Sequence, residues 1–377
     1  MKVLVLSAYD AASHQHWYRT LMEAFPEFDW TLLSLPARYF SWRVRGNSLS
    51  WAFNQRELLE QSYDLVVATS MVDLSALRGF VPKLGLIPSL VYFHENQFVY
   101  PDSGKQFPSV EPKILSLYTA LAADRVAFNS CYNRDTFLLG AQQLLARLPD
   151  QVPMGLLDQL TAVSEVLPVP VADHCFLATQ PSKFGPLQLL WNHRWEYDKA
   201  PERLFAAIKR VLESGVDIKL HVVGQQFRQM PAVFEKMRAF LELNYPAVLL
   251  HYGYIEESSQ YRQILTEADV VISTALHDFQ GLAVLEAVAA GCQPLLPNRL
   301  CYSEWFGPEY LYDSYLEQPE QEADALAECI IGLSHAKQLG DFMAAPSVKN
   351  LSMTALKTQY ADLFQRTIEA FQVRSTL

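Results

Sequence analysis

The hydrophobic positions of the chain fall into short β-rich runs that alternate with stretches of helical periodicity. In the first half, these runs predict strands at Lys2–Ser7, Trp30–Leu35, Leu65–Ala68, Leu90–Phe93 and Arg125–Phe128. Helical patterns fall between most of them or follow them, for example at His16–Ala24 and at Tyr132–Leu148, which Pro149 stops. Such an alternation is typical of a parallel sheet with crossover helices.

The pattern starts again after a proline-containing segment at 166–171, where the order Val-Leu-Pro-Val-Pro-Val predicts an extended linker. The second series of strands is expected at Leu187–Asn192, Ile218–Val223, Val248–Tyr252, Val270–Ser273 and Pro294–Leu296. Its helices are expected at Pro201–Glu213, Ala232–Leu243, Ser258–Thr266 and Leu282–Ala290.

Two such halves predict an α/β protein with two Rossmann-like, doubly wound domains, at 1–170 and 171–350. The remaining segment, 351–377, has helical periodicity and is expected to pack as a helix on the body. Ligands of doubly wound sheets bind outside the carboxyl ends of the strands. The loops that follow the strands are therefore where the chemistry is expected.

Composition narrows the class of protein. The 30 Lys and Arg residues against 41 Asp and Glu residues give a net charge of −11, which argues against non-specific coating of nucleic acid but not against a local basic patch. Five cysteines without a Cys-x-x-Cys pair indicate a reducing compartment and no disulfide framework or zinc site. Because the apolar start is too short for a signal peptide and no stretch has the length of a membrane span, we expect a cytoplasmic protein without integral membrane association.

The most informative stretch, 273–291, runs from a predicted strand through a loop with Asp278 into a helix that opens near Gly281 and Leu282 and carries Glu286. Amides at a helix N-terminus suit a phosphate, and carboxylates accept hydrogen bonds from the vicinal hydroxyls of ribose and hexoses. The alternative is that Glu286 only complements the helix dipole and that Asp278 is solvated.

A second stretch, 191–199, reads Trp-Asn-His-Arg-Trp-Glu-Tyr-Asp-Lys and places Asn192, Arg194 and Lys199 at the end of another strand. Fixed cations at that place can neutralise the charge of a departing diphosphate. Two surface cations among aromatic neighbours are the alternative. Together with the helix terminus and the two carboxylates, the cations favour a site for a sugar diphosphate.

The first half offers polar side chains after two strands. The row at the end of one strand consists of His94, Glu95, Asn96 and Gln97. It is not a zinc-protease signature, because Phe98 stands where the second histidine is required. Ser13 and His14 follow the first strand and are therefore expected at the same edge of the sheet, where the carboxyl ends of the strands lie. His94 can hydrogen-bond a sugar hydroxyl or an acceptor, and a structural histidine is the alternative.

Residues 31–56 contain no acidic residue. They contain Arg38, Arg43, Arg45 and Arg56, interleaved with Tyr39, Phe40, Trp42, Trp51 and Phe53. Arginines that pair with phosphates and aromatic rings that stack on unpaired bases grip single-stranded loops of RNA, so Trp42, Arg43 and Arg45 are candidates for binding an RNA acceptor. An aromatic-rich lid with solvated arginines is the alternative.

The spacing from Asp278 to Glu286 resembles the acid-x7-Glu signature of family 4-type retaining glycosyltransferases with the GT-B fold, although that family usually has Glu at the first position. The resemblance implies two domains that face each other across a cleft. It also implies that Glu286 holds the donor ribose, that Asp278 holds hydroxyls of the transferred sugar, and that Arg194 and Lys199 hold the diphosphate. The turn with Tyr254 and Ile255 would lie near the base.

Three longer motifs resemble the tRNA-queuosine α-mannosyltransferase family: Phe-His-Glu-Asn-Gln-x-x-Tyr-Pro, Trp-Asn-His-Arg-Trp-Glu-x-Asp-Lys and Cys-x-Pro-Leu-x-Pro-Asn-Arg-Leu. The resemblance implies transfer of mannose from GDP-mannose to the cyclopentenediol of queuosine in the tRNA anticodon, with His94, Asp278, Arg194 and Lys199 at the reacting groups. No cofactor and no metal are expected, and the chain contains no Asp-x-Asp. The first loop departs from the family, since Ala11-Ala12 replaces the usual Gly-Gly.

Two other functions stay open. One is a transferase of the same fold that acts on a lipid or cell-surface glycan. Such enzymes often carry a basic amphipathic helix that binds the membrane. The helix at 132–148 has only Arg134 and Arg147 as cations, which argues against this function. The other is a non-catalytic RNA-binding module on a decayed transferase scaffold. The joint presence of Arg194, Lys199 and Glu286 argues against that decay.

Overall fold

The structure, a computed structural model, describes residues 1–100, 109–148, 150–177 and 185–376, so Pro101 and Pro149 lie outside the described residues. Tertiary contacts divide the chain into two units. Unit 1 contains Met1–Pro170 and Met353–Leu377, and unit 2 contains Val171–Ser352. Each unit holds a parallel six-stranded sheet, which confirms the predicted α/β alternation.

The sheet of unit 1 has the strand order β2-β1-β3-β4-β5-β6. The strands are β1 (Lys2–Asp10), β2 (Asp29–Pro36), β3 (Leu65–Thr69), β4 (Ser89–Phe93), β5 (Arg125–Phe128) and β6 (Ser164–Val166). The central strands β3 and β4 are buried along their whole length, as expected of strands covered on both faces. Because all pairs are parallel, the carboxyl ends of the strands meet at one edge.

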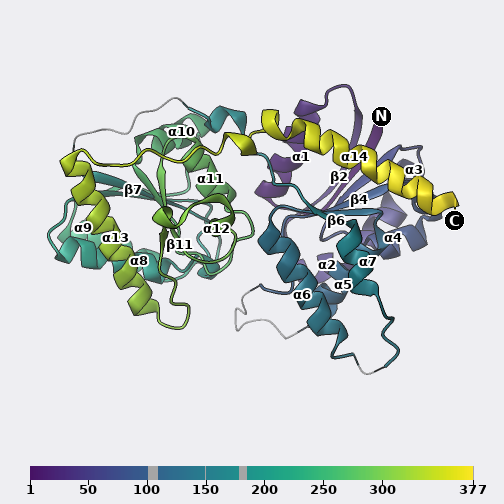
Figure 1. Ribbon diagram of the computed structural model, residues 1–377, viewed down its shortest axis with the longest axis horizontal. Coiled ribbons are helices and arrows are strands. Elements are labelled where there is room, and N and C mark those ends of the chain that lie inside the picture. Colours follow the sequence, from purple (N-terminus) through teal and green to yellow (C-terminus); the bar gives the residue numbers. More distant parts are fainter. Residues whose placement is uncertain (101–108, 149, 178–184, 377) are drawn as a thin grey trace. The chain divides into compact units, whose positions relative to one another are not determined.

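Helices cover both faces of this sheet (Figure 1). The helices are α1 (Ala12–Ala24), α2 (Phe40–Asn54), α3 (Arg56–Leu59), α4 (Leu74–Phe80), η1 (Pro82–Leu86), α5 (Glu111–Ala122), α6 (Cys131–Leu145), α7 (Leu156–Val163) and α14 (Met353–Thr376). Helices α1 and α14 lie on one face, and α2 and α4 to α7 lie on the other. The buried Tyr360 on α14 accepts a hydrogen bond from Trp17 Nε1 at 3.1 Å and donates to the carbonyl of Pro168 at 2.8 Å, which fastens the last helix to unit 1.

The sheet of unit 2 has the order β12-β11-β10-β7-β8-β9. Its strands are β7 (Leu187–Asn192), β8 (Ile218–Val223), β9 (Leu249–Gly253), β10 (Val270–Ile272), β11 (Gln293–Pro297) and β12 (Leu311–Tyr312). Its helices are η2 (Asp173–Cys175), η3 (Tyr197–Lys199), α8 (Pro201–Glu213), α9 (Val233–Asn244), α10 (Ser258–Glu267), α11 (Leu282–Ala289), α12 (Tyr302–Trp305), η4 (Pro308–Tyr310), α13 (Pro319–Leu339) and η5 (Lys349–Leu351). Helices α8, α9 and α13 cover one face, and α10 and α11 cover the other (Figure 1).

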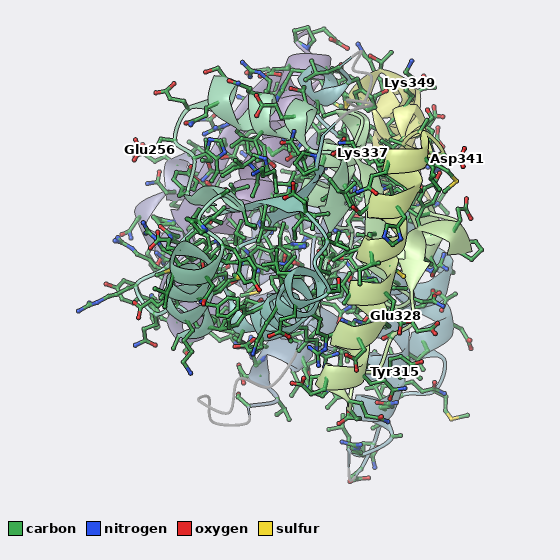
Figure 2. All side chains as sticks on the ribbon, turned by 90° about the vertical axis from the view of Figure 1, so that its left-hand side faces the viewer. Glu256, Tyr315, Glu328, Lys337, Asp341 and Lys349 are labelled. Carbon is green, nitrogen blue, oxygen red and sulfur yellow. The ribbon has the colours of Figure 1, made fainter. Side chains whose placement is uncertain are left out.

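A buried ion pair anchors α13 at the amino edge of this sheet. Lys337, which Figure 2 labels on this helix, donates to Asp269 Oδ2 at 2.5 Å and to the carbonyl of Pro186 at 3.3 Å. Asp269 and Pro186 directly precede β10 and β7. The pair therefore lies opposite the edge at which ligands of such sheets bind. Of the helices that the structure describes, none is both long and apolar enough to cross a bilayer.

Candidate active site

Lys199 lies at the carboxyl edge of the unit 2 sheet, where the loops after β7 and β10 meet. Its buried ammonium donates to the carbonyl oxygen of His277 at 2.5 Å and lies 3.3 Å from Asp198 Oδ2 and 3.7 Å from Asp278 Oδ2. The Lys199 cation therefore helps to tie the loop after β7 to the loop after β10, together with the hydrogen bond from the Leu276 amide to the Asp198 carbonyl at 2.8 Å. An ammonium group has three N–H donors. Because Asp278 Oδ2 at 3.7 Å lies beyond hydrogen-bond distance, the His277 carbonyl and Asp198 leave one N–H of Lys199 for a further acceptor.

Asp278 fastens the start of α11. Its Oδ1 accepts from the amide of Gly281 at 3.0 Å, and its Oδ2 accepts from the hydroxyl of Tyr302 at 3.2 Å. Burial by itself would raise the pKa of Asp278, but Lys199, His193 and the Gly281 amide hold it below its ordinary value. Gly281 has a φ of +73°, a left-handed conformation that glycine adopts at little cost. Asp278 is therefore ionised at the positive end of a helix.

Glu286, one turn into α11, belongs to a chain of hydrogen bonds. The Asn192 side-chain amide donates to the carbonyl of Ala283 at 2.9 Å and to the hydroxyl of Tyr261 at 3.1 Å. Tyr261 in turn donates to Glu286 Oε2 at 3.2 Å. The half-buried Glu286 is thus held beside the end of β7, on the same edge of the sheet as Asp278.

His193 lies between these groups. It is buried, and burial followed by the nearby Lys199 lowers its pKa to about 4, with Asp278, Asp198 and Arg194 also close enough to affect it. Arg194 is exposed and lies 2.9 Å from Glu196 Oε2. A Cβ at Gly224 would lie only 1.8 Å from the carbonyl oxygen of His193, so the loop after β8 presses directly on this turn.

The predicted base-side residues lie farther along the same edge, after β9. Tyr254 is exposed and Ile255 is half-buried, and both follow Gly253, whose φ is +123°. Lys199, Asp278 and Gly281 are thus in direct contact, and Asn192 and Glu286 are joined through Tyr261.

Unit 1 has its own polar cluster at the carboxyl ends of β1 and β4. The His94 ring stacks on His14 with 4.1 Å between centroids, and Trp17 packs edge-on at 5.0 Å. His14 Nε2 lies 3.1 Å from Glu95 Oε2, and Ser70 donates to Glu95 Oε1 at 3.2 Å. Burial, followed by the two nearby histidines, holds the pKa of His94 well below its ordinary value. Both ring nitrogens of His94 are buried and neither has a hydrogen-bond partner among the described residues, so the neutral imidazole has unused hydrogen-bonding capacity.

Several predicted acceptor residues have structural roles instead. The buried Asn96 amide donates to the Asn133 carbonyl at 3.0 Å and to Thr136 Oγ1 at 3.0 Å, so it fixes the loop after β4. Arg43 is buried, with Nε 3.5 Å from the Pro36 carbonyl, and Arg45 forms ion pairs with Asp73 and Glu111. Each of these three side chains therefore has partners within the protein, and their assignment to the acceptor stays a prediction.

The remaining acceptor candidates differ in exposure. Ser13, in the first turn of α1, and Trp42, on α2, are exposed. Gln97 is half-buried and its amide lies 3.9 Å from Met71 Sδ.

Comparison with known proteins agrees with this architecture. Residues 2–171 match the family described as tRNA-queuosine alpha-mannosyltransferase N-terminal, and residues 179–343 match glycosyl transferases group 1. A tRNA-queuosine alpha-mannosyltransferase of Drosophila melanogaster is 30% identical over 380 residues, which cover 97% of each chain. The chain belongs to the tRNA-queuosine alpha-mannosyltransferase family.

Solved structures that resemble this chain show that it has the GT-B glycosyltransferase fold. The sucrose-phosphate synthase of Thermosynechococcus elongatus matches with a TM-score of 0.71 and 14% identity over 98% of this chain and all of the other. HepE of Anabaena in complex with UDP-glucose matches with a TM-score of 0.66 and 12% identity over 97% of this chain and all of the other. As a member of the mannosyltransferase family, the chain is a glycosyltransferase.

Sequence reasoning missed three side chains that organise the candidate active site of this family member. His193 stands inside a quoted motif, but nothing in the pattern indicated that it lies among Lys199, Asp278 and Arg194. Tyr261 and Tyr302 come from α10 and α12, and each donates to one of the two carboxylates. The sequence pattern does not indicate which carboxylate a tyrosine on a helix will contact. Only the folded structure shows the roles of Tyr261 and Tyr302.

The buried histidines of unit 2 predict loss of stability in mild acid. Burial lowers the pKa of His193, His221 and His277 to about 4 in the folded state. Between about pH 6.5 and pH 4 the unfolded chain therefore binds more protons, and each histidine makes the free energy of unfolding fall by up to about 1.4 kcal/mol per pH unit of acidification. We expect urea midpoints to drop steeply in this window. His221→Asn should flatten the slope, and an equal slope in that variant would contradict the assignment.

Proposed function

We propose that unit 2 binds GDP-mannose and that the mannose is transferred, with retention of configuration, to the cyclopentenediol of queuosine in tRNA. The contact of Lys199 and Asp278 at the start of α11 is the observation that carries this proposal, because it joins a fixed cation, helix-end amides and a carboxylate at the edge where such sheets bind ligands. Cys175, Cys292, Cys301 and Cys329 are free thiols, which supports a reducing, cytoplasmic setting.

The diphosphate is assigned to Lys199, Arg194 and the first turn of α11. The Gly281 amide already donates to Asp278, so the helix contribution comes from the positive end of α11 at Leu282 and not from Gly281 as a separate donor. Glu286, oriented by Tyr261, accepts from the ribose hydroxyls, and Asp278 accepts from a hydroxyl of the mannose. Tyr254 and Ile255 lie beside the base.

In the proposed reaction, the bond from the anomeric carbon of mannose to the β-phosphate oxygen breaks while the acceptor oxygen bonds to that carbon from the same face. The acceptor proton passes to the departing phosphate, and GDP leaves. Positive charge at Lys199 and Arg194 stabilises the developing phosphate charge. Neutral His94, together with Ser13, His14 and Gln97 of unit 1, is assigned to hydroxyl groups of the substrates. No enzyme nucleophile and no metal are needed for this step, and no group of three metal-binding side chains occurs among the described residues.

The direct test is incubation with queuosine-containing tRNA and a panel of nucleotide sugars, followed by mass analysis of the nucleosides. We expect a mass increase of one hexose on queuosine with GDP-mannose. Transfer from a uridine-diphosphate sugar only would overturn the donor, and failure with every donor would overturn the function.

Arg194→Ala is expected to lower kcat/KM for mannosyl transfer about 100-fold, because it removes a donor aimed at the leaving group. Stability should change little, since Arg194 is exposed. Arg238→Ala is the matched control: Arg238 is also exposed, belongs to the same unit and pairs with Glu242 at 2.7 Å. Steady-state kinetics of both variants check this, and an unchanged Arg194→Ala enzyme would remove this residue from the diphosphate site.

A further inference from the structure

Helix α2 carries an exposed aromatic face that the proposed reaction does not use. Trp42, Leu49 and Phe53 lie seven and four positions apart, which places them on one side of the helix, and Tyr39 stands one turn before Trp42. These four residues, called here the α2 stripe, are 54%, 42%, 68% and 71% exposed in that order. The opposite side of α2 is buried through Val44, Trp51 and Ala52. A helix docked in this way normally turns polar residues to solvent, so the stripe calls for a partner.

Trp42 is held in place by a glycine. A Cβ at Gly46 would lie 2.2 Å from Cε2 of the Trp42 ring and 2.6 Å from Cδ2 and Cζ2. The Trp42 indole therefore packs on the helix backbone at Gly46, one turn later in the sequence, where any larger residue would displace the ring. About half of the Trp42 surface stays exposed. This arrangement fixes the ring as a flat platform before any ligand arrives.

Tyr39 is exposed and conformationally unusual. Its φ of +56° lies in the left-handed region, which is disfavoured for a bulky residue and which marks functional positions when it is observed. Its carbonyl accepts from the amides of Trp42 and Arg43 at 2.9 and 3.0 Å, which starts the helix. The guanidinium of Arg38 lies 5.5 Å from the centre of the Tyr39 ring. A second ring is thus presented next to a cation.

The stripe stands on a rigid base at the carboxyl edge of the unit 1 sheet. Phe40 packs edge-on against Tyr9 of β1 with 5.9 Å between centroids. The buried Asn47 donates to the Met71 carbonyl at 3.1 Å and accepts from the Asp73 amide at 3.0 Å, and Arg45 is paired with Asp73. Since β1 and β4 end at this same edge, the stripe begins on the side of the sheet that carries His94.

We propose that the α2 stripe stacks unpaired bases of the tRNA, next to the nucleotide that receives the sugar. This inference rests on the proposed function and adds the surface that grips the acceptor. Aromatic faces bind bases of any sequence, and a guanidinium over a ring adds cation–π attraction. Residues 31–56 contain no acidic residue that would repel a phosphate backbone. Arg45 and Arg56 are paired with acidic side chains and Arg43 is buried, so ring stacking and not phosphate pairing carries the contact, which favours unpaired bases over a lipid headgroup.

Two variants of the full chain test the proposal. Trp42→Ala removes the platform, and Gly46→Ala displaces the ring without removing it, in a helix in which alanine is the better helix former. Both are expected to weaken binding of queuosine-containing tRNA at least about fivefold in fluorescence anisotropy. Thermal stability and GDP-mannose affinity should stay unchanged. Leu139→Ala, which truncates an equally exposed apolar side chain on α6, is the matched control and should bind tRNA as the parent does.

The outcomes separate this inference from the proposed function. If both variants bind tRNA as the parent does while transfer of mannose persists, the stripe is not the RNA surface. If the parent binds GDP-mannose but transfers nothing to tRNA, the proposed function fails first. A third measurement uses vesicles of anionic phospholipid. Loss of vesicle binding in Trp42→Ala with intact tRNA binding would overturn the inference in favour of a membrane contact.

Discussion

Lys199→Met is expected to lower kcat/KM for mannosyl transfer by about 10²- to 10³-fold, the cost of removing a preorganised charge from a buried site. The effect should exceed that of Arg194→Ala because the Lys199 side chain is only 8% exposed and contacts Asp278 as well as the His277 carbonyl. Without its cation, Asp278 faces Asp198 and the donor phosphates in a poorly solvated place. Steady-state kinetics, normalised to the folded fraction, measure the change.

A buried lysine elsewhere in unit 2 provides the control. Lys337→Met removes an equally buried ammonium, paired with Asp269 at the opposite edge of the sheet. It is expected to lower the thermal midpoint without a comparable loss of turnover per folded molecule. If Lys199→Met folds and retains its activity, or if both variants lose activity equally, Lys199 does not act on the leaving group.

The largest effect on stability is expected at Glu322 of α13. Its buried carboxylate binds Arg203 Nη1 at 2.6 Å and Arg299 through two bonds of 2.6 and 2.9 Å, and it accepts from the Tyr315 amide at 2.7 Å. Glu322→Ala leaves two buried guanidinium groups without their counter-charge, which costs about 3–5 kcal/mol. Urea unfolding of the variant measures this loss.

The neighbouring Glu320 serves as the comparison. It lies two residues away on the same helix and pairs with Arg210 at 2.6 Å, but its side chain is 79% exposed. Glu320→Ala should change the free energy of unfolding by no more than about 1 kcal/mol, as surface ion pairs do. Similar losses of unfolding free energy in the two variants would mean that burial does not set the strength of the ion pairs of Glu322 with Arg203 and Arg299.

Much of the fold was readable from hydrophobic pattern alone. Strands such as β5, β7 and β8 and the helix α8 have the predicted bounds, because these buried parallel strands are mostly apolar and Pro201 marks the start of its helix. Strands β6 and β12 were not predicted, since three and two residues are too few to show a period. Helix α2 was also missed. Apolar residues lie on both the buried and the exposed side of this helix. The segment is therefore rich in aromatic residues but has no clear helical periodicity.

The candidate site could also be predicted only in part. The predicted cation and carboxylates after β7 and β10 share one edge, because parallel strands bring the loops after them together whatever their distance in sequence. Which arginines of 31–56 are available could not be predicted, because a charge run does not reveal the acids it will meet. The structure pairs Arg45 with Asp73 and Glu111, residues from two other elements. The aromatic residues of the same segment, interpreted from composition alone, divide into the buried Trp51 and the exposed Trp42.

Unit 1 is assembled from both ends of the chain, with the whole of unit 2 inserted between Pro170 and Met353. A ribosome therefore finishes every residue of unit 2 before it supplies α14, whose Tyr360 closes over Trp17. The second unit can complete its folding during translation. The first must wait for α14, and until then one face of its sheet is covered by α1 without α14. A chain whose synthesis stops after unit 2 would therefore contain a complete unit 2 and a unit 1 that lacks α14.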